Sequence, residues 1–403
     1  MLKSLYVVLA CLLLVTAYAG ADEKNQDNDD NFFQSSWNSV KGAMGDLVGP
    51  GASSPELESP VVFGVEDISR LRSDKMKPER AIPVYDNGKV YVVSSRKKLV
   101  VFNLSGERTL EYKLEWAPAG EPLIEDGDIY VGGSDGRFHC LNIATGEEKW
   151  MRNLQLMNFS RPVATDNVLV FQTGRDRLLA LNRDTGEWVW EHQHLRAEDL
   201  ALRSLAPPVI KEGGRLFAGL SGGAVMSLEV ETGKLLWKVV PFDDQKFRDV
   251  DAPLQVDEDT VFAVSAAGKT AALSRKTGRT YWMFERGGMA GATLEGDTLY
   301  LATDRSEMIA IDKVTGKEMW STDLSARKKK RFFDLPTRPL VRGEHIVTVS
   351  RGGRVFVIDK YTGKIVKHYF YYTDTSAPAV PVEEKGFLII DNQGLVRYWQ
   401  DLQ

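Results

Sequence analysis

The sequence predicts an all-β fold: an eight-bladed β-propeller whose blades are four-stranded antiparallel sheets. Three observations lead to this prediction. A short Thr-Gly turn pattern recurs at a spacing of roughly 40 to 47 residues, the range of a propeller blade. Paired runs of β-branched and aromatic residues recur ahead of that turn. The last repeat is one strand short, which predicts a ring closed by a strand from near the N-terminus.

The clearest copy of the turn pattern occupies residues 181–190. In this copy Thr185-Gly186 lies three residues after Asn182, and Trp190 follows the glycine by four residues. The other copies place their glycine at Gly106, Gly146, Gly233, Gly278, Gly316 and Gly363. The first and last copies have Leu110 and Lys367 at the tryptophan position. We expect the tryptophans to wedge between neighbouring blades, which is a structural role.

Ahead of the turns, two apolar runs flank a Gly- and Asp-rich turn, which is the pattern of a β-hairpin. The sequence contains eight such hairpins, with inner runs near Val90, Ile129, Leu169, Leu216, Val261, Leu299, Ile346 and Leu388. Most follow a Pro-Val or Pro-Leu pair, such as Pro83-Val84, which is predicted to begin the innermost strand. An innermost strand, a hairpin and the strand after the Thr-Gly turn together make four strands per blade.

The eighth hairpin ends at Trp399 with only four residues left, so its outermost strand is missing. The segment between Val61 and Leu71 precedes the first proline-initiated strand at a suitable distance. We expect this segment to complete the last blade, so that residues 61–403 form the propeller.

Residues 1–21 have the pattern of a secretory signal peptide. Lys3 precedes an apolar run from Leu5 to Val15, and Ala17-Tyr18-Ala19 forms a small-residue cleavage site. The run is short for a transmembrane helix, so the mature chain is predicted to be exported. The residues before Cys11 faintly resemble a lipoprotein box, but the apolar run ahead of Cys11 is very short. A lipid anchor on Cys11 is therefore the less favoured alternative.

Residues 22–60 are predicted to be a polar tether containing a short amphipathic helix. Its apolar residues follow helical spacing: Phe33, Trp37, Val40, Met44 and Leu47. The favoured interpretation is a helix packed on the propeller flank, or a fluctuating segment. The alternative is a helix that binds a membrane surface or a partner.

Composition and motifs argue against enzymatic chemistry. The formal net charge of -5 gives no reason to expect nucleic acid as a partner. The histidines lack metal-ligand spacing, and no nucleophile elbow, P-loop or dinucleotide fingerprint occurs. After signal removal Cys140 is the one remaining cysteine, and it is expected to be a small buried hydrophobe. We therefore predict no catalytic residues, no metal and no cofactor.

A basic run lies in the long connection that follows Trp320. It consists of Arg327, Lys328, Lys329, Lys330 and Arg331, followed by Phe332-Phe333. Such a run is most often a solvated loop. The alternative is contact with anionic lipid headgroups or an acidic partner.

The repeated pattern Ala/Ile-x-Asn/Asp-x-x-Thr-Gly-x-x-x-Trp resembles that of pyrroloquinoline-quinone propellers over nearly all of residues 60–403. Two families share this repeat. The quinoprotein dehydrogenases carry adjacent cysteines and a calcium site, and this sequence has no Cys-Cys pair. The BamB family consists of eight-bladed periplasmic lipoproteins that act without catalysis in outer-membrane β-barrel assembly.

Two short stretches resemble segments of the BamB family. Asp249-Val250-Asp251, before Pro253, is similar to its Asp-Val-Asp segment, and residues 200–203 are similar to its Leu-x-Leu-Arg segment. In that family both neighbouring loops dock onto the barrel insertase BamA. The resemblance thus implies partner-binding roles for Leu200, Leu202, Arg203, Asp249 and Asp251. The alternative is structural, with the two aspartates capping turns and Leu200 packing in the core.

The resemblance implies a non-catalytic scaffold on the periplasmic side of the outer membrane. Its implied partners are a BamA-like insertase, the rest of the assembly complex and unfolded outer-membrane proteins. The competing hypothesis is a quinone-dependent dehydrogenase or a quinone-binding sensor.

Overall fold

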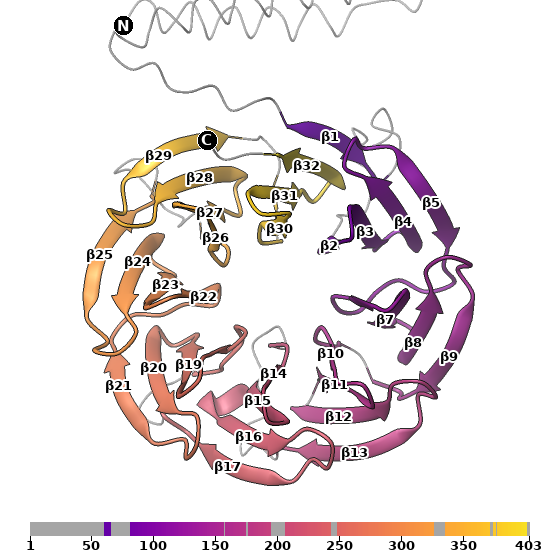
Figure 1. Cartoon of the computed structure of the whole chain (residues 1–403), viewed down its shortest axis with the longest axis horizontal. Coiled ribbons are helices and arrows are strands. Elements are labelled where there is room, and N and C mark those ends of the chain that lie inside the picture. Colours follow the sequence, from indigo (N-terminus) through magenta and orange to yellow (C-terminus); the bar gives the residue numbers. More distant parts are fainter. Residues whose placement is uncertain are drawn as a thin grey trace, which may run out of the picture. The chain divides into compact units, whose positions relative to one another are not determined.

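The computed structural model describes residues 60–65, 81–156, 158–174, 176–194, 206–242, 248–325, 335–370, 374–375 and 377–400. All of them belong to one compact unit, Glu56–Gln403. They form eight four-stranded antiparallel sheets arranged as the blades of a ring (Figure 1). The predicted eight-bladed propeller is confirmed. The predicted signal peptide, tether and helix between Phe33 and Leu47 lie outside the described residues.

In seven blades the four strands follow one another in sequence order from the inside of the ring outward. Blades 1 to 4 consist of β2 (Val84–Asp86), β3 (Lys89–Ser94), β4 (Lys98–Asn103), β5 (Arg108–Lys113); β6 (Leu123–Glu125), β7 (Asp128–Gly132), β8 (Arg137–Asn142), β9 (Glu148–Asn153); β10 (Val163–Ala164), β11 (Val168–Thr173), β12 (Arg177–Asn182), β13 (Trp188–Gln193); and β14 (Val209–Lys211), β15 (Arg215–Gly219), β16 (Val225–Glu229), β17 (Leu235–Val239).

Blades 5 to 7 consist of β18 (Gln255–Val256), β19 (Thr260–Ser265), β20 (Lys269–Ser274), β21 (Thr280–Phe284); β22 (Gly291–Glu295), β23 (Thr298–Ala302), β24 (Glu307–Asp312), β25 (Glu318–Asp323); and β26 (Leu340–Arg342), β27 (His345–Val349), β28 (Arg354–Asp359), β29 (Ile365–Phe370). Blade 8 combines β30 (Val380–Val382), β31 (Gly386–Ile390) and β32 (Leu395–Trp399) with β1 (Val61–Gly64) as its outermost strand.

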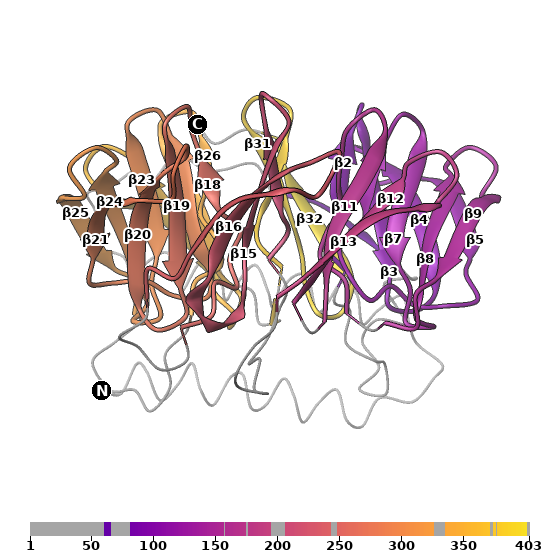
Figure 2. The same cartoon turned by 90° about the horizontal axis from the view of Figure 1, so that it is seen from below.

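The strands run between two faces of the ring (Figure 2). Because each blade repeats the same antiparallel order, every innermost strand starts on the same face. We call this the connection face, since the chain passes there from one blade to the next. The Thr-Gly turns lie on the opposite face, which we call the turn face. No helix in the described part of the chain is long and apolar enough to cross a membrane.

The ring is closed as predicted, by an N-terminal strand. β1 pairs antiparallel with β32, with Val61 opposite Tyr398 and Gly64 opposite Leu395. The buried Phe63 side chain packs against Phe102 of blade 1, with ring centroids 4.7 Å apart. It also lies over Gly106, where an added Cβ would be 3.0 Å from its ring. Phe63 therefore joins blade 8 to blade 1.

Tryptophans join most of the other blades, which confirms their predicted wedge role. Each indole N–H donates a hydrogen bond to a backbone carbonyl in the next blade: Trp150 to Arg183 (3.0 Å), Trp190 to Val230 (2.8 Å), Trp237 to Arg275 (3.0 Å), Trp282 to Lys313 (3.0 Å) and Trp320 to Lys360 (3.1 Å). Each ring also covers the Thr-Gly glycine of that next blade. At Gly233, for example, φ is +69° and an added Cβ would lie 2.6 Å from the Trp190 ring.

The contacts between blades 1 and 2 and between blades 7 and 8 are made by other residues. In blade 1 the residue that covers Gly146 is Tyr112, whose hydroxyl donates to the Ala144 carbonyl at 2.8 Å. Leu110, at the tryptophan position, packs instead on the core between blades 1 and 2. Blade 8 has no Thr-Gly turn, so blade 7 packs on it through Tyr369 against the cluster that contains Trp399.

The Asn or Asp of each pattern shapes its turn. The Asn182 side-chain oxygen accepts hydrogen bonds from the backbone N–H groups of Asp184 and Thr185 and from the Thr185 hydroxyl. Asp359 accepts the equivalent bonds from Tyr361 and Thr362. A short polar side chain that organises its own turn explains why Asn and Asp recur at this position.

A basic residue follows the Asn, Asp or Ser in four copies, and it ties each blade to the preceding one. Its carbonyl accepts the tryptophan bond, while its side chain reaches the turn between the two inner strands of the preceding blade. These contacts are Arg183 Nη2 to Asp126 Oδ2 (2.6 Å), Arg275 Nη2 to the Glu212 carbonyl (2.7 Å), Lys313 Nζ to Asp257 Oδ2 (3.4 Å) and Lys360 Nζ to Glu295 Oε2 (3.2 Å). Sequence reasoning missed this feature.

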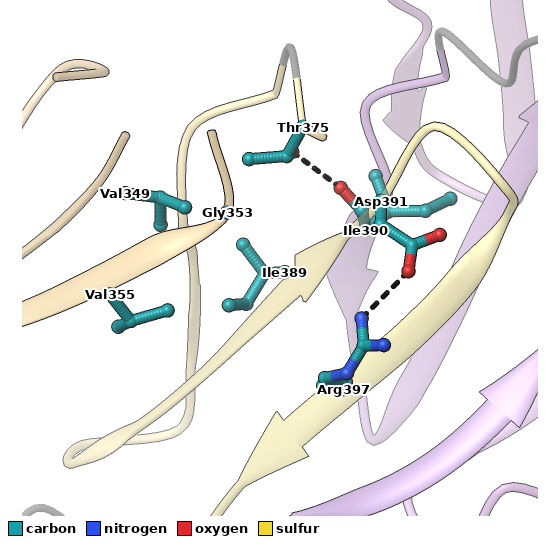
Figure 3. A pocket seen from close by; sticks show the side chains of 8 residues that line it. All are labelled: Val349, Gly353, Val355, Thr375, Ile389, Ile390, Asp391 and Arg397. Carbon is teal, nitrogen blue, oxygen red and sulfur yellow. Dashed lines mark hydrogen bonds and ion pairs between the residues drawn. The ribbon is translucent and has the colours of Figure 1, made fainter. Parts of the chain in front are cut away.

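A small pocket between blades 7 and 8 has its polar groups engaged within the protein (Figure 3). Arg397 Nη1 donates to the buried Asp391 carboxylate at 2.8 Å. The Thr375 hydroxyl donates to the Ile390 carbonyl at 2.6 Å. The remaining lining consists of apolar side chains and Gly353, so this pocket belongs to the packing between the two blades.

Gly233→Ala should destabilise the propeller more than Gly213→Ala. Both glycines have positive φ, so both alanines cost about 1 kcal/mol of backbone strain. Nothing lies within 4 Å of a Cβ at Gly213, whereas a Cβ at Gly233 collides with Trp190. We expect this collision to cost about 2 kcal/mol more. Urea unfolding measures both values, and equal losses would contradict the role of the Trp-Gly contact.

Phe63→Ala should weaken the ring closure by about 3 kcal/mol, because a buried aromatic side chain is truncated at a blade interface. Val62→Ala on the same strand is the matched control, since Val62 is 44% exposed, and its effect should stay below about 1 kcal/mol. Thermal and urea unfolding give both differences. Similar losses of unfolding free energy in the two variants would show that Phe63 packing does not stabilise the closed ring.

Asp359→Asn should remove part of the acid sensitivity of the fold. The hydroxyl and backbone N–H of Thr362 lower the pKa of Asp359 below its ordinary value. The charged carboxylate therefore adds stability above the unfolded-state pKa of about 4, and this contribution is lost as pH falls through the lower folded-state pKa. The unfolding free-energy difference between parent and variant should be constant above about pH 5 and shrink below about pH 4.

Asn182→Asp provides the reciprocal control, because Asn182 accepts the same bonds without a charge. It should acquire the acid dependence that Asp359→Asn loses. Urea unfolding between pH 3 and pH 7 tests both variants. Parallel pH profiles for the parent and both variants would refute the assignment.

Candidate docking site

Asp249 lies on the connection face, just ahead of the innermost strand of blade 5, and is only 2% exposed. Its Oδ1 accepts a hydrogen bond from the backbone N–H of Gly222 at 2.7 Å. Gly222 belongs to the short 3-10 helix η1 (Ser221–Gly223), which connects β15 to β16 in blade 4. The Asp249 carbonyl accepts a bond from Ala266 in the β19–β20 turn of blade 5. Asp249 therefore fastens two blades together.

The residues on either side of Asp249 strengthen this attachment. Arg248 Nε donates to the Gly222 carbonyl at 2.8 Å, and the Val250 N–H donates to the Leu220 carbonyl at 3.1 Å. Gly223 has a φ of +78°, and a Cβ there would lie 3.0 Å from Arg248 Cγ. The close approach of segment 248–250 to η1 therefore depends on glycine at this turn.

A third blade joins the same network through Asp176. This aspartate lies in the β11–β12 turn of blade 3 and is 5% exposed. Its carboxylate accepts hydrogen bonds from the Ser221 hydroxyl and from the Ser221 N–H, the latter at 3.2 Å. Asp176, Ser221, Gly222 and Asp249 thus form a chain of contacts across blades 3, 4 and 5, which we call the three-blade network.

Of the residues predicted to bind a partner, the structure describes two. Asp249 is inside the three-blade network, and its contacts match the structural alternative of turn capping. Asp251 follows it two residues later and is half-buried. Leu200, Leu202 and Arg203 lie outside the described residues, in the connection between β13 and β14. The basic run from Arg327 to Arg331 also lies outside them.

Sequence reasoning missed Asp176 and Ser221. Both residues matter because η1 contacts two other blades. It binds segment 248–250 of blade 5 on one side and Asp176 of blade 3 on the other. The Ser-Gly-Gly run at residues 221–223 was the available signal. Two adjacent glycines, both with positive φ in the structure, mark a turn that another segment approaches closely.

The opposite face has a hollow lined by the inner strands and turns of blades 4 to 6, including Lys211, Asp257 and Arg275. The Arg275 guanidinium donates to the carbonyls of Glu212 and Glu258, at 2.7 and 3.1 Å. Lys313 binds Asp257. Arg275 and Asp257 are therefore already engaged in contacts within the propeller.

The described residues do not provide the groups that quinoprotein chemistry uses. Cys140 is 1% exposed, and burial raises the pKa of its thiol to about 12, which favours the unreactive protonated form. Within the described ranges, no group of three or more His, Cys, Asp or Glu side chains is placed to hold a metal ion. No adjacent cysteine pair occurs in the sequence.

A family profile described as "Outer membrane protein assembly factor BamB" matches residues 66–150, 109–322 and 267–394. The chain belongs to the BamB family. The matched ranges together extend over blades 1 to 7 and over β30 and β31 of blade 8. They include Asp176, Ser221 and Asp249, the acidic and hydroxyl side chains of the three-blade network.

Individual BamB proteins resemble this chain at low identity. The Shewanella oneidensis protein is 27% identical over 244 residues, which cover 59% of this chain and 60% of that protein. The Nitrosomonas eutropha protein is 22% identical over 367 residues, covering 89% and 85%. The aligned regions span 60%, 63% and 59% of the lengths of the Shewanella oneidensis, Yersinia pestis and Alteromonas naphthalenivorans proteins.

Solved structures share the fold. The crystal structure of BamB from Moraxella catarrhalis matches with a TM-score of 0.69 and 19% identity, covering 84% of this chain and 100% of that one. The fold also extends beyond the BamB family. Quinohemoprotein alcohol dehydrogenase from Comamonas testosteroni has a TM-score of 0.67 at 14% identity, covering 85% and 76%. Lupanine 17-hydroxylase [cytochrome c] of a Pseudomonas species is 25% identical over 306 residues, covering 62% and 41%.

Proposed function

We propose that this protein is a non-catalytic scaffold of the outer-membrane β-barrel assembly machinery. It acts on the periplasmic side of the outer membrane and docks onto a BamA-like insertase. The family match between residues 66 and 394 carries this proposal. Residues 1–21 serve as its signal peptide, and residues 22–60 as a polar tether. The rest of the assembly complex and unfolded outer-membrane proteins are its further partners.

The connection face of blades 3 to 5 is the proposed docking surface. Leu200 and Leu202 supply an apolar anchor, and Arg203 makes forked, charge-assisted bonds with the insertase. Asp251 supplies an acidic group to the same proposed surface. Asp249 has a different task, because its buried carboxylate already holds Gly222. It holds segment 248–250 against η1 instead of contacting the partner.

The basic run from Arg327 to Arg331 is proposed to be a solvated loop. The alternative is contact with anionic headgroups or with an acidic partner. Contact with headgroups predicts that the protein floats with anionic liposomes. Loss of that flotation on charge removal would support the alternative. The docking proposal does not depend on either outcome.

Quinone binding is the second candidate function, favoured by the resemblance of the repeat to that of pyrroloquinoline-quinone propellers. The residues do not fit it well, because no adjacent cysteine pair exists and Cys140 is buried in the core. An absorbance spectrum of the purified protein, recorded after addition of quinone and calcium, separates the two functions. A stoichiometric bound-quinone spectrum would favour the second.

Arg203→Glu should abolish co-purification of the insertase from solubilised envelopes. It reverses the charge at the centre of the proposed surface, and loss of a desolvated charged partner costs roughly 2–5 kcal/mol, which is more than tenfold in affinity. The variant should be exported and melt like the parent, because the blade contacts made by the tryptophans are untouched.

Arg305→Glu is the matched control. Arg305 is exposed on the same face, in the β23–β24 turn of blade 6. This variant should retain the insertase. If Arg203→Glu captures the insertase as well as Arg305→Glu does, the docking surface is wrongly placed.

A further inference from the structure

One position of the repeat carries charge in three blades only. It is the residue immediately before the proline that begins the innermost strand, and it lies on the connection face at the inner edge of the ring. The charged examples are Glu121 in blade 2, Arg161 in blade 3 and Arg338 in blade 7. The equivalent residues of blades 1, 4 and 5 are uncharged: Ile82, Pro207 and Ala252.

These three charged side chains influence one another electrostatically although their blades are not all neighbours. Arg161 Nη1 lies 3.5 Å from Glu121 Oε1, which forms an ion pair between blades 2 and 3. Blade 7 is three blades from blade 2, counting through blades 1 and 8. Even so, Arg338 interacts electrostatically with both Glu121 and Arg161. Charged residues from two sides of the ring therefore share its inner edge on one face.

Burial shifts the pKa of two groups in the cluster. Burial is the largest influence on Glu121 and raises the pKa of its carboxyl, while Arg161 and Arg338 oppose that rise. Burial likewise lowers the pKa of Arg338, and the Glu121 carboxylate only partly offsets this effect. The side chains of Arg161 and Glu121 are nevertheless 38% and 24% exposed, so a small solute can reach them.

The charges of the cluster do not balance. Two guanidinium groups face one carboxylate, which leaves one positive charge in surroundings where unpaired charge is costly. Arg161 is paired with Glu121. Among the described residues, no hydrogen bond or ion pair engages the Arg338 guanidinium. Its planar set of donors is therefore available to a ligand from outside the chain.

We propose that Arg161 and Arg338, together with Glu121, form a binding site for a single carboxylate group. A carboxylate carries the one negative charge that the cluster lacks. Its two oxygens also match the forked donors of a guanidinium. Binding of a carboxylate here does not depend on the insertase, so each proposal can fail alone.

The test uses the mature protein and a neutral-capped peptide, N-acetyl-trialanine, in its free-acid form. Isothermal titration at low ionic strength should show saturable binding of the acid and none of the C-terminal amide. Added salt should weaken the binding, because exposed charges are screened. Equal binding of acid and amide would overturn the proposal. Saturable binding of inorganic phosphate without binding of the acid would overturn the ligand class.

Two substitutions in the cluster should change the affinity for the free acid in opposite directions. Arg338→Gln should weaken acid binding by about tenfold or more, because it removes a charged, forked donor. It should fold normally, since no hydrogen bond or ion pair of the Arg338 side chain within the described residues is lost. Glu121→Gln should tighten acid binding, because it removes the competing carboxylate. Arg305→Gln, an exposed arginine of the same face, should have no effect. Unchanged affinity in both Arg338→Gln and Glu121→Gln would refute the site.

Discussion

The contact between an indole ring and a glycine of the next blade is the interaction on which the propeller depends. It imposes two requirements on the sequence at once. The glycine must adopt positive φ, and it must have no Cβ, because the ring occupies that space. The indole N–H then fixes the distance between blades through its bond to a carbonyl of the turn. The apolar clusters between the sheets form around this fixed spacing.

Much of the fold could be predicted because this contact leaves a regular trace in the sequence. The Thr-Gly turns, the hairpins and the missing outer strand of blade 8 are all local patterns. Because the last repeat has only three strands, a fourth strand from near the N-terminus was expected, and β1 is that strand. Exceptions arise where another residue performs the same task. Tyr112 covers Gly146 from a position two residues beyond the expected one, on the same side of its strand, and a hydroxyl replaces the indole N–H. Spacing alone does not reveal such a substitution.

The candidate site was less accessible to prediction, since contacts between blades depend on how the ring curves. Asp249 was selected by resemblance as a partner contact, and the structure gives its carboxylate an internal partner in Gly222. Asp176 lies more than forty residues before Ser221, and no periodicity connects the two. The basic residues at Arg183, Arg275, Lys313 and Lys360 were visible in the repeat. Their role became clear only when each side chain was seen to cross to the preceding blade.

The strand that closes the ring has a consequence for how the chain is made. β1 leaves the ribosome before every blade, but its hydrogen-bonding partner β32 is synthesised after nearly all of them. Residues 61–64 must therefore remain unpaired until the last blade exists, and their pairing is among the most non-local contacts that the fold contains. A chain interrupted before Trp399 keeps an open sheet edge in place of a closed ring. Completion of synthesis is in this way linked to the loss of an aggregation-prone, protease-accessible surface.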